Sequence, residues 1–220
     1  GMFTANPNDV PSARLLKELD YQEAQELATM GAEVLHPRCI DPVREHGIPL
    51  HIRCVEAPEV VGTRISDDTP SVGPQVKAIS AKTGITLVSM ETLGMWQEVG
   101  FLSDAFGCFK QNGLSIDLVA TSETNVTVSL DPTANALDDE TIRSLLDDLD
   151  DHCEASEIGP CAVVSLVGRH IRSILHELGP ALEVFDEQYV HLVSQAASDL
   201  NFSFVVDEGQ VERLVRDLHS

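Results

Sequence analysis

Two carboxylates and two hydroxyls lie close together in the stretch GLSIDLVATSETNVTVSL, residues 113–130. Asp117 interrupts a run of alternating apolar residues, and Thr121, Ser122 and Glu123 follow where that run ends. A carboxylate is an anionic acceptor that can hold an ammonium group, and neighbouring hydroxyls add further acceptors. These four side chains therefore predict a site for a small cationic group.

The complementary chemistry is predicted upstream, at Gly100-Phe101-Leu102. These residues lie in the first turn of a predicted helix over 98–111, where backbone N–H groups lack helical partners and the helix dipole favours an anion. Glycine at this position lets a ligand approach the backbone closely. Together with Asp117, this helix start suits a ligand that carries both a carboxylate and an ammonium group.

Plainer interpretations of the same residues stay open. Asp117 could be an edge-strand residue in solvent, and Thr121-Ser122-Glu123 could be turn chemistry, because hydroxyls bond readily to nearby backbone. The acidic run from Asp138 to Asp151 is best explained as the solvated face of a helix. Met95 could belong to an interface core.

The composition limits the partners of this chain. Its 220 residues include 36 acidic and 14 basic ones, and the resulting charge of −22 repels nucleic acid and anionic membrane. The 43 % hydrophobic content is enough to bury a core, and no apolar run approaches the roughly 18 residues of a membrane span. The five cysteines show no metal-ligand spacing, so we expect no metal site and a reducing, cytoplasmic location.

Hydrophobic periodicity predicts the elements that must position these residues. Asp20 is a predicted N-cap, with Glu23 as its capping-box partner, for a helix over 20–35. In the stretch at 113–130, the alternation predicts a hairpin with Ile116, Leu118 and Ala120 on one face of its first strand. The other predicted elements are helices over 41–46, 138–150, 170–187 and 209–218, strands over 48–54, 76–80, 85–90, 161–168, 190–196 and 201–206, a turn at Lys82-Thr83-Gly84, and a boundary within 56–75.

The order of these elements repeats once along the chain. A shift of 76 residues aligns six identical pairs, which predicts two copies of a β-α-β-β-α-β unit of ferredoxin-like size. Gly100, Asp117 and Thr121 fall on different residues in the second copy, so they are better candidates for a site special to the first. The identical pairs are Leu102 and Leu178, Phe109 and Phe185, Ala120 and Ala196, Ser122 and Ser198, Asn125 and Asn201, and Asp131 and Asp207; the three differing counterparts are His176, Val193 and Ala197.

Two stretches resemble aspartate kinases. GAEVLHPRCIDPV (31–43), preceded by FTANP (3–7), resembles the end of that family's catalytic domain. GFLSDAFGCFKQNGLSIDLVATSETNVTVSLD (100–131) resembles the first of the family's two regulatory ACT modules, most closely in the lysine-inhibited branch. The resemblance implies an α+β fold in which tandem ferredoxin-like ACT modules follow a remnant of an α/β amino-acid-kinase domain.

Other parts of the family's catalytic apparatus are not found in the sequence. The Lys-Gly-Gly segment and the Gly-rich phosphate loop are missing, and no GxxxxGK[ST] or GxGxxG replaces them. Asn8 and Glu33 also depart from the residues that the family commonly has near the nucleotide. We therefore expect no catalytic residue, metal or cofactor in this chain, whereas the parent enzyme would use ATP and Mg.

The resemblance also implies domains, a site and partners. The expected domains are a kinase remnant over 1–66, a linker and joining strand over 67–84, a first ACT module over 85–157 and a second over 158–220, with the first module inserted in the second. The expected effector is L-lysine, or L-threonine, bound where the first modules of a homodimer meet. Glu98 departs from lysine-sensitive relatives and adds negative charge there. The implied effector-binding residues are Met95, Gly100, Phe101, Leu102, Ser115, Asp117, Thr121, Ser122 and Glu123.

Two rival hypotheses come from other classes of protein. The chain could be a separate, non-catalytic regulatory subunit, which would more naturally begin near the ACT region. It could also be a degenerate homologue with a structural role, although Asp117 and Glu123 are both present.

Overall fold

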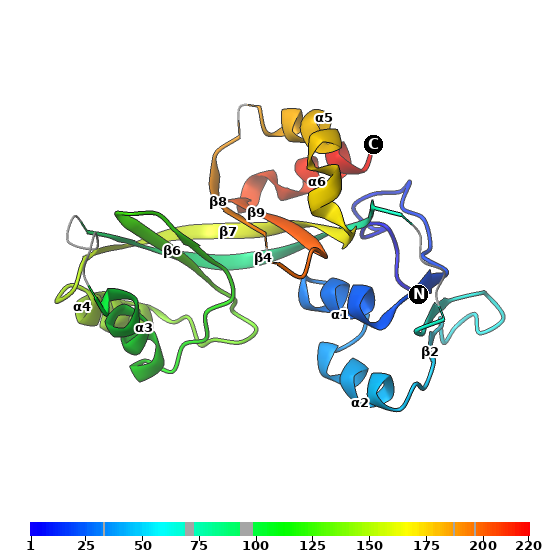
Figure 1. Cartoon of the computed structure of the whole chain (residues 1–220), viewed down its shortest axis with the longest axis horizontal. Helices are drawn as coiled ribbons and strands as arrows, with labels where there is room; N and C mark the ends of the chain where they lie inside the picture. Colours follow the sequence, from blue (N-terminus) through cyan, green and yellow to red (C-terminus); the bar gives the residue numbers. More distant parts are fainter. Residues whose placement is uncertain (33, 69–72, 93–98, 187, 196) are drawn as a thin grey trace. The chain divides into compact units, whose positions relative to one another are not determined.

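The computed structural model describes residues 1–220 except residues 33, 69–72, 93–98, 187 and 196 (Figure 1). The chain forms two compact units. Unit 1 comprises residues 1–82, 163–191 and 195–220, and unit 2 comprises residues 83–162 and 192–194. In the part of the chain that the structure describes, no helix is both long and apolar enough to cross a membrane.

The first 65 residues of unit 1 build a small three-stranded sheet with helices beside it. Strand β3 lies between β1, which runs parallel to it, and β2, which runs antiparallel to it. The elements are β1 (Glu18–Leu19), α1 (Tyr21–Thr29), the 3₁₀ helix η1 (Pro37–Cys39), α2 (Ile40–Glu45), β2 (Leu50–Ile52) and β3 (Thr63–Ile65).

Helix α1 begins as predicted and ends earlier than predicted. The Asp20 carboxylate accepts from the Glu23 N–H, and the Glu23 carboxylate accepts from the Asp20 N–H, which confirms the capping box. The helix ends at Thr29 instead of residue 35 because the chain turns at Gly31, whose φ is +112°. A Cβ there would lie 2.6 Å from the carbonyl oxygen of Ala81, so only glycine fits this close approach.

A six-stranded sheet with the order β5-β6-β4-β7-β9-β8 carries the rest of the chain. Its longest strands are β4 (Gln75–Glu91) and β7 (Glu154–Arg169), and both contribute residues to both units. The predicted turn at 82–84 is wrong, since β4 runs through it even though Gly84 has a φ of +74°. With β6 and β7 on its two sides, β4 gains more ladder bonds by staying extended.

Unit 2 contains the first copy of the repeat. The order β4, α3 (Phe101–Gln111), β5 (Val119–Thr121), β6 (Asn125–Leu130), α4 (Asp139–Leu149), β7 is the predicted β-α-β-β-α-β sequence. Helices α3 and α4 pack against each other over one sheet face, around a core that includes Val88, Val128 and Leu145 (Figure 1). Ile142 and Leu149 on α4 are buried, so the acidic run is the exposed helix face that the sequence indicated.

The second copy returns to strand β4. After β7 come η2 (Ile171–Leu178), α5 (Gly179–Leu182), η3 (Glu183–Phe185), β8 (Val190–Ser194), β9 (Asn201–Asp207), η4 (Glu208–Gln210) and α6 (Val211–His219). The order β4-β7-β9-β8 makes β4 the fourth strand of this copy. The segment predicted as a helix over 170–187 is helical from Ile171 to Phe185, but it consists of three consecutive pieces, of which only Gly179–Leu182 is α-helical. Gly179, before Pro180, keeps helical backbone with a φ of −47° and a ψ of −55°.

Candidate functional site

Helix α3 presents an accessible N-terminus. Gly100 is its N-cap residue, with a φ of +108°, and has no side chain that could cap the first turn. Phe101 is 5 % exposed and anchors this turn in the core, whereas Leu102 is 43 % exposed. Among the residues that the structure describes, no side chain forms a cap hydrogen bond at this helix start. The first turn can therefore receive an anion.

Asp117 lies at a β-bulge on the edge of the sheet. Its N–H donates to the carbonyl of Ser129 at 3.0 Å, while the Ser129 N–H donates to the carbonyl of Leu118 at 2.9 Å. Two residues thus oppose one, and the Ser129 hydroxyl also accepts from the Leu118 N–H at 2.9 Å. Asp117 itself is exposed. Bulges redirect side chains and occur often beside functional sites.

The bulge also changes which residues share a face. Ile116 packs against the core of unit 2, and regular pairing resumes only where Val119 opposes Val128. The prediction that Leu118 and Ala120 share the face of Ile116 is wrong, because the extra residue shifts the alternation by one position.

Thr121, Ser122 and Glu123 have different environments. Thr121 is the last residue of β5 and Glu123 is at the hairpin tip, both exposed. The Ser122 hydroxyl accepts from the Asn125 N–H at 3.0 Å, and the Ser122 N–H donates to the Asn125 carbonyl at 2.8 Å. The turn interpretation therefore holds for Ser122, which fixes the shape of the loop that carries the other two.

Two contacts connect these residues to neighbouring segments. The Ser115 N–H donates to the side chain of Asn135 at 2.6 Å, and the Asn135 amide donates back to the Ser115 carbonyl at 3.0 Å. The Thr92 N–H, just after β4, donates to the Thr124 carbonyl at 2.9 Å. Thr92 therefore lies beside the hairpin tip, whereas Met95 and Glu98 lie outside the described residues. Asn135 is 8 % exposed, and neither periodicity nor a motif distinguishes it in the sequence.

The second copy fills the corresponding helix start with its own carboxylate. Helix η2 begins after His170, and the Asp199 carboxylate accepts from the Arg172 N–H at 2.7 Å. Asp199 is the counterpart of Glu123 under the shift of 76. The helix starts correspond as Gly100 and His170, so the alignment of Gly100 with His176 is wrong, because the second copy has a shorter segment between strand and helix.

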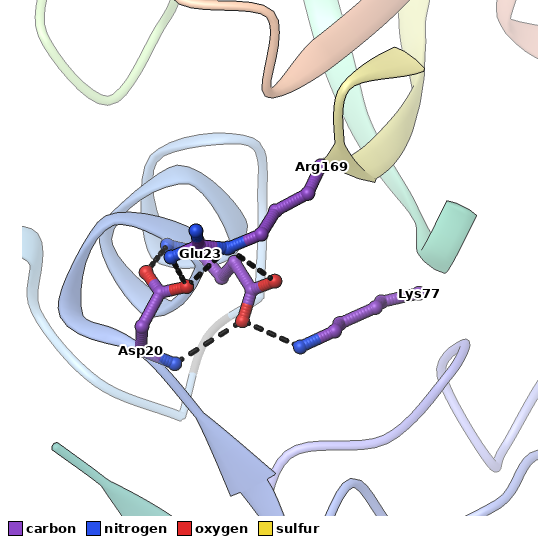
Figure 2. A network of polar contacts seen from close by, with 4 residues as sticks. All are labelled: Asp20, Glu23, Lys77 and Arg169. Carbon is purple, nitrogen blue, oxygen red and sulfur yellow. Dashed lines mark hydrogen bonds and ion pairs between the residues drawn. The ribbon is translucent and has the colours of Figure 1, made fainter. Parts of the chain in front are cut away.

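A second polar group, within unit 1, was not predicted as a cluster (Figure 2). Lys77 of β4 and Arg169 of β7 both bind the carboxylate of Glu23, with Nζ–Oε2 at 2.7 Å and Nε–Oε1 at 3.2 Å. Arg169 also binds Asp20, whose Oδ2 accepts from Nε at 2.6 Å. The capping-box pattern identified Asp20 and Glu23 in the sequence. Their cationic partners, Lys77 and Arg169, lie 54 and 146 residues from Glu23, so no local sequence pattern could predict these contacts.

Burial and hydrogen bonding oppose each other at Asp20. Burial raises the pKa of its carboxyl, but bonds from the Glu23 N–H and the Arg169 guanidinium outweigh that effect and lower the pKa below its ordinary value. Burial likewise lowers the pKa of Arg169, and the two acids more than reverse this. Asp20 and Arg169 therefore stabilise each other's charged forms.

The FTANP segment is also held within unit 1. The Thr4 hydroxyl lies 2.7 Å from Nε2 of His219, at the end of α6, and the Ser12 hydroxyl lies 3.3 Å from Nδ1 of the same ring. His36 caps η1, with its Nδ1 accepting from the Arg38 N–H at 3.2 Å. The five cysteines, all among the described residues, form no disulfide.

Comparisons with known proteins relate the N-terminal segment to the amino acid kinase family and the whole chain to aspartokinases. Residues 1–54 match the amino acid kinase family. The chain is 32 % identical over 229 residues to aspartokinase 1, chloroplastic, of Arabidopsis thaliana, which covers all of this chain and 39 % of that protein. It spans between 39 % and 49 % of the length of the curated relatives it matches.

Solved structures agree with this relationship. The chain is similar to Escherichia coli aspartokinase III in complex with lysine and aspartate, with a TM-score of 0.85, 30 % identity, and coverage of all of this chain and 49 % of that one. It is also similar to the regulatory subunit of aspartate kinase from Thermus flavus, with a TM-score of 0.56 over 66 % of this chain and 97 % of that one. At 13 % identity, the second likeness concerns the fold alone.

Proposed function

We propose, since the chain is homologous to aspartokinases along its whole length, that it is the regulatory region of an aspartate kinase and binds L-lysine for feedback inhibition. The parent enzyme would transfer phosphate from ATP to L-aspartate, with catalysis outside this chain. The observation that carries the proposal is the accessible first turn of α3, which begins at Gly100 in a first-copy module similar to that of a lysine-bound aspartokinase.

The chemistry of lysine matches the groups that the first copy presents. Its carboxylate would accept from the N–H groups of the first turn after Gly100, where the helix dipole favours an anion. Its α-ammonium would bind Asp117, which the bulge places at the sheet edge. Its ε-ammonium would bind Glu123 with help from Thr121. Phe101 and Ser122 would act by fixing the first turn and the hairpin tip.

The remaining residues of the proposed site belong to the same two segments. Leu102 is partly exposed beside the first turn, and Ser115 precedes the bulge. Met95 completes the proposed set, at a position outside the described residues. We further propose that two chains meet through their first modules at this site and that lysine favours an inhibited arrangement of their kinase domains.

A separate regulatory subunit is a weaker alternative. The Thermus flavus regulatory subunit is similar to 66 % of this chain, whereas residues 1–54 match the amino acid kinase family. A kinase-like segment has no evident use in a subunit that only binds an effector, so the regulatory region of a longer enzyme is favoured.

The test is calorimetric titration of the chain with L-lysine and then with L-threonine. We expect lysine to bind and Asp117→Asn to weaken it by about 10- to 150-fold, because a hydrogen bond to a charged group contributes roughly 1.5–3 kcal/mol. Asparagine keeps the size of the side chain and removes its charge.

Glu157→Gln is the matched control, since it removes an exposed carboxylate from β7 without touching the site. It should bind lysine as the unaltered chain does. Heat with threonine alone would reassign the effector, and no heat with either amino acid on folded, dimeric protein would contradict the proposal.

A further inference from the structure

Four charged residues join helix α1 to two neighbouring strands in unit 1 (Figure 2). Glu23 lies at the centre, with its side chain 1 % exposed, and its two oxygens bind cations from different strands. Oε2 is bound by Lys77 near the start of β4, and Oε1 is bound by Arg169 at the end of β7. One carboxylate thus fixes the position of two strands relative to the helix.

The geometry leaves the cluster little freedom. Asp20 holds Arg169 from the other side, and its own side chain is only 9 % exposed. If either strand moved along its axis by about the length of a hydrogen bond, a buried carboxylate would lose its cation, which is strongly unfavourable. Closely packed groups of this kind do not deform continuously. A displacement of a strand therefore changes the cluster from one discrete arrangement to another.

The two strands also lead to the proposed effector module. Strand β4 continues from Lys77 through Thr86–Glu91, where it pairs with β6, and the chain then proceeds to α3. Strand β7 is the next strand in the chain after α4, which ends at Leu149, and it runs from Glu154 to Arg169. The residues that hold α1 are therefore on the strands that flank both helices of that module.

We propose that the cluster of Asp20, Glu23, Lys77 and Arg169 is a coupling joint that transmits effector binding from β4 and β7 to helix α1. The inference rests on the proposed function, since it assigns to these residues the regulation of the segment that matches the amino acid kinase family. Each residue acts by positioning α1, and none of them touches the effector.

The test is hydrogen–deuterium exchange of the whole chain with and without saturating L-lysine. In the unaltered chain we expect lysine to change amide exchange in α1, residues 21–29, by about threefold or more. Arg169→Met should reduce that change to less than about 1.5-fold while the lysine Kd stays within about threefold. Arg172→Met is the matched control, because it removes an exposed guanidinium three residues away and should leave the response intact.

A second variant keeps the inference testable if the single change unfolds the chain. Glu23→Gln combined with Lys77→Met removes one acid and one cation together, so no buried charge is left without its partner. We expect it to bind lysine and to lose the response of α1. A structural role alone would alter exchange equally with and without lysine, so it would not remove the response.

The possible failures are distinguishable. An α1 response that persists in both cluster variants, with lysine bound, overturns the coupling joint and leaves the proposed function standing. Absence of lysine heat in the unaltered chain overturns the proposed function, and the inference with it.

Discussion

Asp20 caps helix α1 and also forms a long-range ion pair with Arg169. Its protonation is therefore linked to the free energy of unfolding of the chain. Its pKa lies below the ordinary value of 3.8, despite burial, through its hydrogen bonds with Glu23 and Arg169. A lowered folded-state pKa means that the unfolded chain binds the proton more tightly. The stabilisation is therefore complete above the ordinary pKa and is lost as the pH falls through the folded-state value.

We expect the urea midpoint of the chain to fall more steeply between about pH 5 and pH 3 than that of Asp20→Asn. In this interval the unfolded chain takes up a proton at Asp20 more readily than the folded chain does, and the variant has no carboxylate there to protonate. Unfolding curves at several pH values measure this difference. Asp41→Asn, an exposed position on α2, is the control and should follow the unaltered chain. Parallel curves for the chain and Asp20→Asn would contradict the assignment.

At the scale of elements, two glycines on the same helix have opposite roles. Gly100 has a φ of +108°, which a residue with a side chain adopts only at a cost, whereas a Cβ on Gly107 would meet nothing within 4 Å. We expect Gly100→Ala to destabilise the chain by about 1–2 kcal/mol. Gly107→Ala should stabilise it by about 0.5–1 kcal/mol, because alanine favours the helix interior.

Thermal unfolding of the two variants decides between these signs. Each variant serves as the control for the other, because both substitutions add one methyl group, one at the N-cap of α3 and one in its interior. Equal destabilisation by the two substitutions would show that α3 starts elsewhere or that packing outweighs backbone conformation.

Elements with local signals were predictable from the sequence, and those determined by distant partners were not. The start of α1 at Asp20 follows from its own capping residues. The bulge at Asp117 depends on Ser129 across the hairpin, and the continuity of β4 through Gly84 depends on strands on both sides. For the site, residue types predicted which groups bind a ligand, whereas the commitment of Ser122 to the turn required coordinates.

At the scale of the whole molecule, residues 1–66 share a hydrophobic core with strands β4 and β7. Among the residues that the structure describes, seven of the nine buried ones in that core come from residues 1–66, and the other two, Ala78 and Val167, come from β4 and β7. The seven are Met2, Leu19, Tyr21, Ala24, Leu27, Ile40 and Ile65. The proposed domain boundary near residue 66 therefore separates segments that bury each other's apolar surface.

We expect a chain of residues 67–220 to lose protection in unit 1 and to expose the apolar and charged surface around Ala78 and Lys77. The core of unit 2 draws its buried residues from 88–149 and should keep its protection in α3 and α4. Hydrogen exchange by mass spectrometry, with dye binding as a measure of exposed apolar surface, tests this. Native protection throughout the shortened chain would contradict it.

The interleaving of the two units along β4 and β7 has a consequence for synthesis on the ribosome. All of unit 2 except residues 192–194 has been made once Ala162 is added, whereas unit 1 also needs α6, which ends at His219. At translation rates of about 5–20 residues per second, roughly 3–11 s separate these events. Unit 2 can therefore fold while the C-terminal part of unit 1 is still being made, whereas the buried core around residues 1–66 has all its described members once Val167 has been added.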